Sequence, residues 1–222
     1  SSFYPPHHMT MGEGGAGYTK NATLHKIIRS FRDWGRDCIC PSGVDNLCGH
    51  RFDRQFGTLP LGYDHKYTYS HFGYNLKATD MQAAIGCAQL EKFPSFVERR
   101  KYNWKRIYDG LKSVQDKLIL PEPVENSSPS WFGFCITCRD GVNRNELVKK
   151  IEAQNIQTRA LFAGNLTRHP CFDQIRGSDA YRVIGDLGET DRIMNNTFWI
   201  GVYPGMTDAM LDKMISVIKA SV

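Results

Sequence analysis

The sequence predicts an α/β fold, because patterns typical of helices alternate along the chain with patterns typical of strands. Apolar residues recur at helical spacing in several segments, and short aromatic or β-branched runs lie between those segments. The length of 222 residues is enough for a sizeable core in one or two domains.

The first half of the chain combines helical patterns with one long irregular segment. Residues 9–19 surround a cluster of glycines and predict a hairpin, and residues 24–34 have the apolar spacing of an amphipathic helix. Residues 37–70 are rich in Gly, Cys and Tyr without a clear period, and an irregular segment of that length is usually functional. Residues 79–93 and 96–111 predict two more helices, the first with a largely buried apolar face that includes Cys87.

The second half continues the alternation of helices and strands. Three strands are expected, at residues 131–137, 156–160 and 197–202. Two helices are expected, at residues 143–154 and 207–219, the second capped by Thr207.

Composition indicates an ordinary soluble globular protein, with 41% apolar and 23% charged residues. The net charge of +5 suits either an anionic substrate or scattered surface lysines, and no block of like charge indicates nucleic-acid binding. We find neither a signal peptide nor an apolar run long enough to span a membrane, so we expect a cytoplasmic protein. The seven cysteines are an odd, uneven set typical of thiols or metal ligands.

The most informative motif lies at residues 2–15, which read Ser-Phe-Tyr-Pro-Pro-His-His-Met-Thr-Met-Gly-Glu-Gly-Gly. From the residues alone it is either a glycine hairpin with two surface histidines or a loop whose backbone approaches a ligand, with Ser2 donating to a phosphate. The motif resembles the lysine segment of the sugar aminotransferases of the DegT/DnrJ/EryC1/StrS family, which use pyridoxal phosphate. In that pattern, the position of the lysine falls on His7.

The replacement of lysine by His7 changes the expected chemistry. An imidazole cannot form a Schiff base with the cofactor aldehyde, but it can move a proton near neutral pH. The resemblance implies that Ser2 binds the cofactor phosphate and that His7 is the catalytic base, with Tyr4 a candidate substrate-binding residue. It also implies a cofactor that is bound non-covalently as pyridoxamine phosphate.

A second motif is formed by Cys38, Cys40 and Cys48, which lie within eleven residues of the irregular segment. Thiolates are soft ligands that can converge on one metal centre, although the Cys-x-Cys spacing fits poorly with a zinc knuckle and free thiols are an alternative. Together with His7, this spacing resembles the iron–sulfur members of the same family. The resemblance implies a 2Fe-2S cluster held by these three cysteines and by a fourth cysteine N-terminal to this chain.

Asn75 and three arginines complete the candidate site. The segment around Tyr74 and Asn75 is a turn before a helix in its simplest interpretation, and it is similar to a Gly-Tyr-Asn segment of the family. There the asparagine reaches the cofactor phosphate of the neighbouring subunit, which implies the same role for Asn75 and a homodimer. A guanidinium suits paired phosphate oxygens, although solvated or salt-bridged arginines are the common case. We name three candidate substrate-binding arginines and rank Arg192 first: Arg159, Arg168 and Arg192.

Taken together, the resemblance implies the aspartate-aminotransferase-like (type I) fold of pyridoxal phosphate enzymes. Residues 1–92 would end its large cofactor-binding domain, and residues 93–222 would form its small α/β domain, as the C-terminal half of a longer protein. The implied activity is C-3 deoxygenation of a CDP-4-keto-6-deoxyhexose on the way to 3,6-dideoxy sugars of lipopolysaccharide O-antigen. The implied partner is an NAD(P)H-dependent flavin/iron–sulfur reductase.

Three other functions remain open on sequence alone. One is a cluster-free GDP-4-keto-6-deoxymannose 3-dehydratase, and a second is a sugar aminotransferase. The third is a zinc-stapled interaction domain without catalysis.

Overall fold

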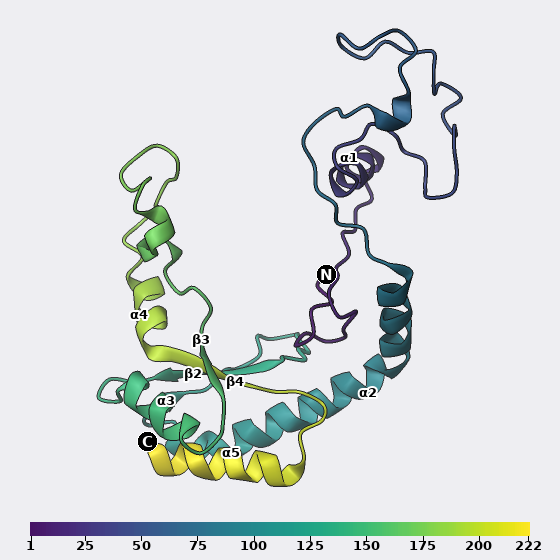
Figure 1. The fold of residues 1–222 in the computed structure, drawn as a ribbon. Helices are drawn as coiled ribbons and strands as arrows, with labels where there is room; N and C mark the ends of the chain where they lie inside the picture. Colours follow the sequence, from purple (N-terminus) through teal and green to yellow (C-terminus); the bar gives the residue numbers. More distant parts are fainter. The chain divides into compact units, whose positions relative to one another are not determined.

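The computed structural model describes residues 1–222, which form two compact units, Ser1–Leu90 and Glu91–Val222 (Figure 1). Every buried hydrophobic side chain of the core lies in the second unit. The assignment of residues 1–92 to a large cofactor-binding domain remains a prediction. No helix has the length and apolar character needed to cross a membrane.

The first unit contains helix α1 (Ala22–Arg32), the short 3-10 helix η1 (His65–Tyr67) and the start of helix α2 (Asp80–Leu111). The predicted helix at residues 24–34 is therefore confirmed as α1. The side chain of Asn21 caps α1 by accepting from two backbone N–H groups of its first turn. Most of residues 37–70 is irregular, as expected.

The predicted hairpin at residues 9–19 is wrong. Ser2 instead forms an antiparallel bridge with Gly15, and the Phe3 N–H donates to the Gly14 carbonyl at 2.9 Å. The chain does bend at Gly12 and Glu13, but the segment that pairs with Gly15 is the start of the chain. Residues 2–15 thus form one closed loop.

A close backbone crossing follows α1. Gly35 has φ +82°, and a Cβ built on it would lie 1.9 Å from the carbonyl oxygen of His71. A Cβ on Gly73 would lie 2.3 Å from the nitrogen of Gly35. Only glycine fits at both positions, so the crossing fixes where the irregular segment leaves α1 and where it returns.

One continuous helix, α2, replaces the two helices predicted at residues 79–93 and 96–111. Pro94 lies inside it; it removes one backbone donor, but the helical runs on both sides are long enough to continue across it. The expected buried face at the start of this helix is also wrong, because Met81, Ile85 and Cys87 are exposed. Within this chain, nothing packs over that face closely enough to bury them.

The second unit is built on a four-stranded antiparallel sheet in the order β1-β2-β4-β3. Strands β2 (Gly133–Cys138), β3 (Thr158–Ala160) and β4 (Thr197–Gly201) confirm the three predicted strands within a few residues, whereas β1 (Leu118–Ile119) was not predicted.

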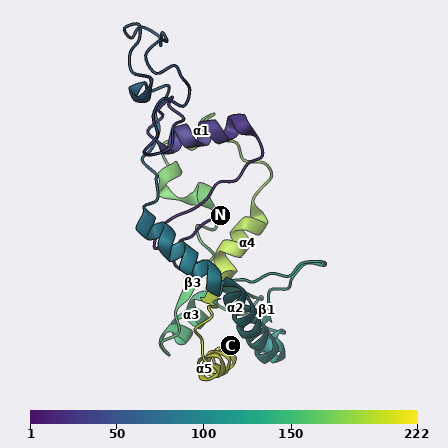
Figure 2. The ribbon, with the colours of Figure 1, turned by 90° about the vertical axis from the view of Figure 1, so that its right-hand side faces the viewer.

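Helices α3 (Arg144–Glu152) and α5 (Asp208–Ser221) confirm the two helices predicted in the second half, and they lie against one another below the sheet (Figures 1 and 2). Asn143 caps α3 and Thr207 caps α5, as expected for the latter. Helix α4 (Gly188–Asn196) was not predicted. The remaining elements are three short 3-10 helices: η2 (Lys112–Val114), η3 (Leu166–Arg168) and η4 (Pro170–Phe172).

Side-chain alternation in the strands divides the sheet into two faces. Phe134 and Ile136 of β2 and Phe198 and Ile200 of β4 are fully buried in the core. The neighbouring positions of the same strands point to the other face, which is where Trp199 lies.

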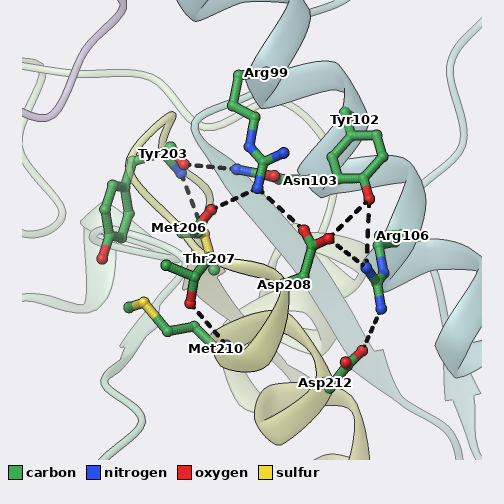
Figure 3. A network of polar contacts seen from close by, with 10 residues as sticks. All are labelled: Arg99, Tyr102, Asn103, Arg106, Tyr203, Met206, Thr207, Asp208, Met210 and Asp212. Carbon is green, nitrogen blue, oxygen red and sulfur yellow. Dashed lines mark hydrogen bonds and ion pairs between the residues drawn. The ribbon is translucent and has the colours of Figure 1, made fainter.

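A polar network joins the second half of α2 to the start of α5 (Figure 3). Arg99 donates to the Met206 carbonyl at 2.9 Å and contacts Asp208 at 3.1 Å, while Arg106 lies 3.2 Å from Asp208. The buried side chain of Asn103 donates to the Tyr203 carbonyl at 2.8 Å. These contacts satisfy polar groups at the entrance to α5 and anchor α2 in the second unit.

Candidate active site and cysteine site

The closed loop at residues 2–15 brings Ser2, Tyr4 and His7 together. The His7 N–H donates to the Tyr4 carbonyl at 3.0 Å, and the two rings meet edge-on with centroids 5.7 Å apart. Ser2 Oγ accepts from the Tyr4 N–H at 3.3 Å, which leaves its hydroxyl proton available to donate. The loop therefore offers a hydroxyl donor, a phenol and an imidazole on one short stretch of backbone.

Asn75 lies in an antiparallel bridge with Asp33, and not in the simple turn that the sequence suggested. Its exposed side chain accepts from Lys77 Nζ at 3.3 Å, and the same ammonium lies 3.3 Å from the Asp33 carboxylate. Partial burial works to raise the pKa of Asp33, but Arg32 and Lys77 outweigh it and hold that pKa below its usual value. The Asn75 amide is thus held beside an ammonium group whose charge Asp33 offsets.

The three candidate arginines lie in the second unit, in different environments. Arg168 forms an ion pair with Asp191, and Arg192 lies 2.6 Å from Glu189, whose hydrogen bond raises the pKa of Arg192. Both guanidinium groups are therefore neutralised locally. Arg159 donates to the backbone carbonyl of Thr158 at 2.8 Å, so its charge is the least compensated of the three.

An aromatic pocket borders Arg159 on the open face of the sheet. Arg159 and Cys135 are both cross-strand partners of Trp199, and the Trp199 indole donates to the Ala160 carbonyl at 3.0 Å. Aromatic residues on either side of Gly133 were a usable sequence signal for this pocket, which was not predicted. The residues that line it are Trp131, Phe132, Gly133, Cys135, Leu161, Phe162 and Trp199.

The three cysteines of the second motif do converge. Cys38, Cys40 and Cys48 line a single small cavity, together with His65 and two basic residues, Arg51 and Lys66. Burial is the largest cause that raises the pKa of the Cys38 thiol, and the neighbouring Cys40 thiol adds to it.

Hydrogen-bond donors already point at two of these sulfur atoms. The Leu47 N–H donates to Cys40 Sγ at 3.4 Å, and the His50 N–H donates to Cys48 Sγ at 3.4 Å. His65 Nδ1 lies 3.6 Å from Cys48 Sγ. N–H donors stabilise negative charge on sulfur, whereas the charges of Arg51 and Lys66 are offset by their ion pairs with Asp64 and Asp45.

The cavity offers a partial ligand set. No group of three or more His, Cys, Asp or Glu side chains in the chain is arranged to hold a metal ion by itself. The remaining cysteines lie elsewhere: Cys87 and Cys171 are exposed, and Cys135 and Cys138 belong to β2. The expectation that Cys87 is a core residue was wrong. Cys38, Cys40 and Cys48 are thus thiols that line one cavity without forming a complete metal site.

Comparison with known proteins decides the family. Residues 1–219 match the DegT/DnrJ/EryC1/StrS aminotransferase family. The chain belongs to this family. Solved structures with the same fold include the E. coli GDP-4-keto-6-deoxy-D-mannose-3-dehydratase with bound hydrated PLP, at a TM-score of 0.78 and 24% identity over 98% of this chain and 53% of that one. The predicted fold of pyridoxal phosphate-dependent transferases is therefore confirmed.

Within the DegT/DnrJ/EryC1/StrS family, two curated relatives are similar over nearly the whole chain. The lipopolysaccharide biosynthesis protein RfbH of Salmonella typhimurium is 61% identical over 97% of this chain and 49% of its own length. The dTDP-4-dehydro-2,6-dideoxy-D-glucose 3-dehydratase of Saccharopolyspora spinosa is 52% identical over 96% of this chain and 46% of its own length. The chain thus spans about half the length of these relatives.

Proposed function

We propose that this chain belongs to an enzyme that removes the C-3 hydroxyl of a nucleotide-linked 4-keto-6-deoxyhexose, with a CDP sugar as the expected substrate. The observation that carries the proposal is His7, an imidazole at the lysine position of a chain in an aminotransferase family. Relatives named as nucleotide-sugar 3-dehydratases and as a lipopolysaccharide biosynthesis protein support it. The expected pathway leads to 3,6-dideoxy sugars, and the expected location is the cytoplasm.

His7 is the general base in this proposal. Bound pyridoxamine phosphate would supply an amine that condenses with the C-4 ketone and a ring that accepts electrons. His7 would act as the base that takes the proton from the cofactor's C-4′ carbon, which would allow the C-3 hydroxyl to leave. The edge-on contact with Tyr4 orients the imidazole, while the Ser2 hydroxyl holds the cofactor phosphate.

The candidate substrate-binding arginines all lie in the second unit. Arg159 is the arginine best suited to the substrate diphosphate, because Arg168 and Arg192 already have carboxylate partners. This changes the order of preference expected from the sequence, which put Arg192 first. Tyr4 remains a candidate contact on the sugar side.

The cysteine site would hold a 2Fe-2S cluster, with Cys38, Cys40 and Cys48 as ligands and a fourth ligand from elsewhere in the full-length protein. The cluster would supply single electrons, which an NAD(P)H-dependent flavin/iron–sulfur reductase must replace. The convergence of the three thiols and the N–H donors at two of them support this assignment. The enzyme would be a homodimer in which Asn75 reaches the partner's cofactor phosphate.

A cluster-free dehydratase is the second candidate. Relatives named GDP-4-keto-6-deoxy-D-mannose 3-dehydratase are 26–28% identical over most of this chain. The cysteine cavity argues against this candidate, because such an enzyme has no need for three converging thiols. Family membership argues against the zinc-stapled interaction domain.

The test uses the full-length protein, purified without oxygen. We expect iron and labile sulfide in equal amounts, a visible absorption spectrum typical of a 2Fe-2S cluster, and turnover of a CDP-4-keto-6-deoxyhexose that depends on a reductase. Turnover of the GDP sugar without iron or reductase would support the cluster-free dehydratase instead. Stoichiometric zinc without sulfide would exclude the redox assignment.

A further inference from the structure

A histidine links the cysteine site to a carboxylate. His65 Nδ1 lies 3.6 Å from Cys48 Sγ, and His65 Nε2 lies 2.5 Å from Asp37 Oδ2. The His65 residue is 5% exposed, in a unit where few side chains are buried. Both ring nitrogens therefore have a partner, and one of those partners is a sulfur of the proposed cluster site.

The imidazole of His65 is held from several sides. The Phe56 ring stacks on it with centroids 5.1 Å apart and an angle of 19° between the planes. Its backbone N–H donates to the Arg51 carbonyl at 2.9 Å, which anchors the start of η1. Rotation of the ring would leave two buried nitrogens unpaired, so the observed orientation is strongly preferred.

We propose that His65 is a positioning residue for Cys48: Asp37 orients the imidazole, and the imidazole donates a hydrogen bond to the sulfur and so tunes the cluster. This inference rests on the iron–sulfur part of the proposed function and deepens it. A cluster-bound sulfur carries no proton, so Nδ1 donates to Sγ. Nε2 donates to the Asp37 carboxylate, so the proposed ring carries a proton on both nitrogens, with Asp37 as its counter-ion. The arrangement matches the outer-sphere contacts that orient metal ligands and adjust their donor strength.

The direction of the effect follows from charge. Reduction adds an electron to the cluster and its sulfurs, so a hydrogen bond to sulfur stabilises the reduced state more than the oxidised state. Loss of the His65 donor should therefore make the midpoint potential more negative. The backbone donor at Cys48 from His50 remains in every His65 variant, so the cluster should still assemble.

Two variants separate the two ends of the imidazole. His65→Asn keeps a side-chain N–H near the place of Nδ1 and loses the contact with Asp37, whereas His65→Gln keeps an N–H near the place of Nε2 and loses the donor to Cys48. His65→Leu removes both. A matched control is His50→Leu, because the His50 ring contacts Asp53 at 2.8 Å and its side chain has no recorded contact with a sulfur.

The experiment is a redox titration of the full-length protein, followed by visible absorption and electron paramagnetic resonance, with iron and sulfide measured in every sample. At a fixed applied potential we expect the ratio of reduced to oxidised cluster to fall about tenfold in His65→Gln and His65→Leu, a shift of ~59 mV for a one-electron couple. His65→Asn should lie between these variants and wild type, and His50→Leu should match wild type.

The outcomes are distinct. A wild-type protein without iron and sulfide overturns both the cluster assignment and this inference. A wild-type cluster whose potential is unchanged in His65→Gln and His65→Leu overturns the inference alone. Loss of iron in all three His65 variants, including His65→Asn, also overturns it, because that result makes His65 a ligand or a residue needed for folding.

Discussion

His7 is half-buried in a loop that also holds Ser2 and Tyr4, and its chemistry differs from that of the lysine common in this family. A primary amine bonds covalently to the cofactor aldehyde, whereas an imidazole is restricted to proton transfer. The Tyr4 ring contacts the imidazole edge-on, with ring centroids 5.7 Å apart.

His7→Lys in the full-length protein should allow that covalent bond to form. We expect the cofactor to remain attached after borohydride reduction, as measured by mass spectrometry, and the dehydration rate to fall by at least ~100-fold, because the positioned base is lost. Wild-type protein treated in the same way should release its cofactor. A His7→Lys protein with full activity and no attached cofactor contradicts the assignment.

His7→Ala tests the base directly. Dehydration should fall ~100- to 10,000-fold, the usual contribution of a general base, while cofactor binding persists through Ser2. The matched control is His8→Ala, which removes the neighbouring imidazole. If His8→Ala produces the larger loss, His8 is the base.

Site residues that lie close together in the sequence could be predicted from their spacing. Residues that are far apart in the sequence and meet only in the fold could not. Cys38, Cys40 and Cys48 lie within eleven residues, so their convergence could be expected. Asp37 and His65 are 28 residues apart in a segment without periodicity, so only the fold brings them together. The sequence signal for this contact was the position of His65 inside a cysteine-rich irregular segment.

At the scale of elements, the cysteine loop carries a separate prediction. Cys38→Ser, Cys40→Ser or Cys48→Ser should each remove most of the iron and sulfide, because one lost thiolate leaves an iron undercoordinated. The iron and sulfide content is measured by elemental analysis and visible absorption of protein prepared without oxygen.

Cys87→Ser and Cys171→Ser are the controls for these loop variants, since both thiols are exposed and lie away from the cavity. Both should retain wild-type iron. Proton removal by His7, followed as hydrogen exchange at the cofactor C-4′ carbon, should survive in part in the three cluster variants, because it requires no electrons.

The crossing of Gly35 and Gly73 makes the cysteine loop sensitive to a methyl group placed outside it. Gly35→Ala introduces a Cβ 1.9 Å from a backbone oxygen at φ +82°, whereas Gly43→Ala introduces one at φ +78° with no heavy atom within 4 Å. Gly43→Ala should cost about 1–2 kcal/mol of unfolding free energy, the penalty of the left-handed backbone alone. Gly35→Ala should lower the unfolding free energy further, because its Cβ also clashes with the His71 carbonyl oxygen. Equal urea midpoints for the two variants would show that the crossing imposes no constraint.

Apolar periodicity predicted the elements that pack around the core and also α1, which has no buried residue in this chain. The strands β2 and β4 and the helices α3 and α5 pack around one core, so their patterns were clear. The break expected near Pro94 did not occur: the proline removes one backbone hydrogen bond and crowds the preceding turn, yet α2 continues on both sides of it. The two residues of β1 were too short to give a pattern.

At the scale of the whole molecule, the two units differ in how they bury apolar surface. The second unit has a complete core of its own, whereas the apolar stripe of α1 (Leu24, Ile27, Ile28 and Phe31) remains 41–48% exposed in the first. The family match covers both units, and the fold could be predicted because the motifs of the first unit resemble a known family. Composition and periodicity alone predicted only the α/β fold class.

The last prediction concerns assembly. If Asn75 completes the phosphate site of the partner subunit, Asn75→Ala should weaken pyridoxamine phosphate binding by about 1–3 kcal/mol, the cost of leaving a charged hydrogen-bonding group unpaired. The fold should persist, because Asn75 is exposed and its place in the bridge with Asp33 depends on backbone atoms. Calorimetric titration of the cofactor-free protein measures the loss, and circular dichroism checks the fold.

Mixed dimers then decide which chain Asn75 serves. A heterodimer of Asn75→Ala with His7→Ala should contain one site with both defects and one intact site. At a cofactor concentration too low to fill the Asn75→Ala site, activity should therefore partly return when the two proteins exchange subunits. The control pairs His7→Ala with Ser2→Ala: both residues lie in one closed loop, so each heterodimer site keeps one defect and no activity returns. Recovery in the first pair and not in the second places Asn75 across the interface. Absence of recovery in both, with subunit exchange shown by mass spectrometry, means that Asn75 serves its own chain.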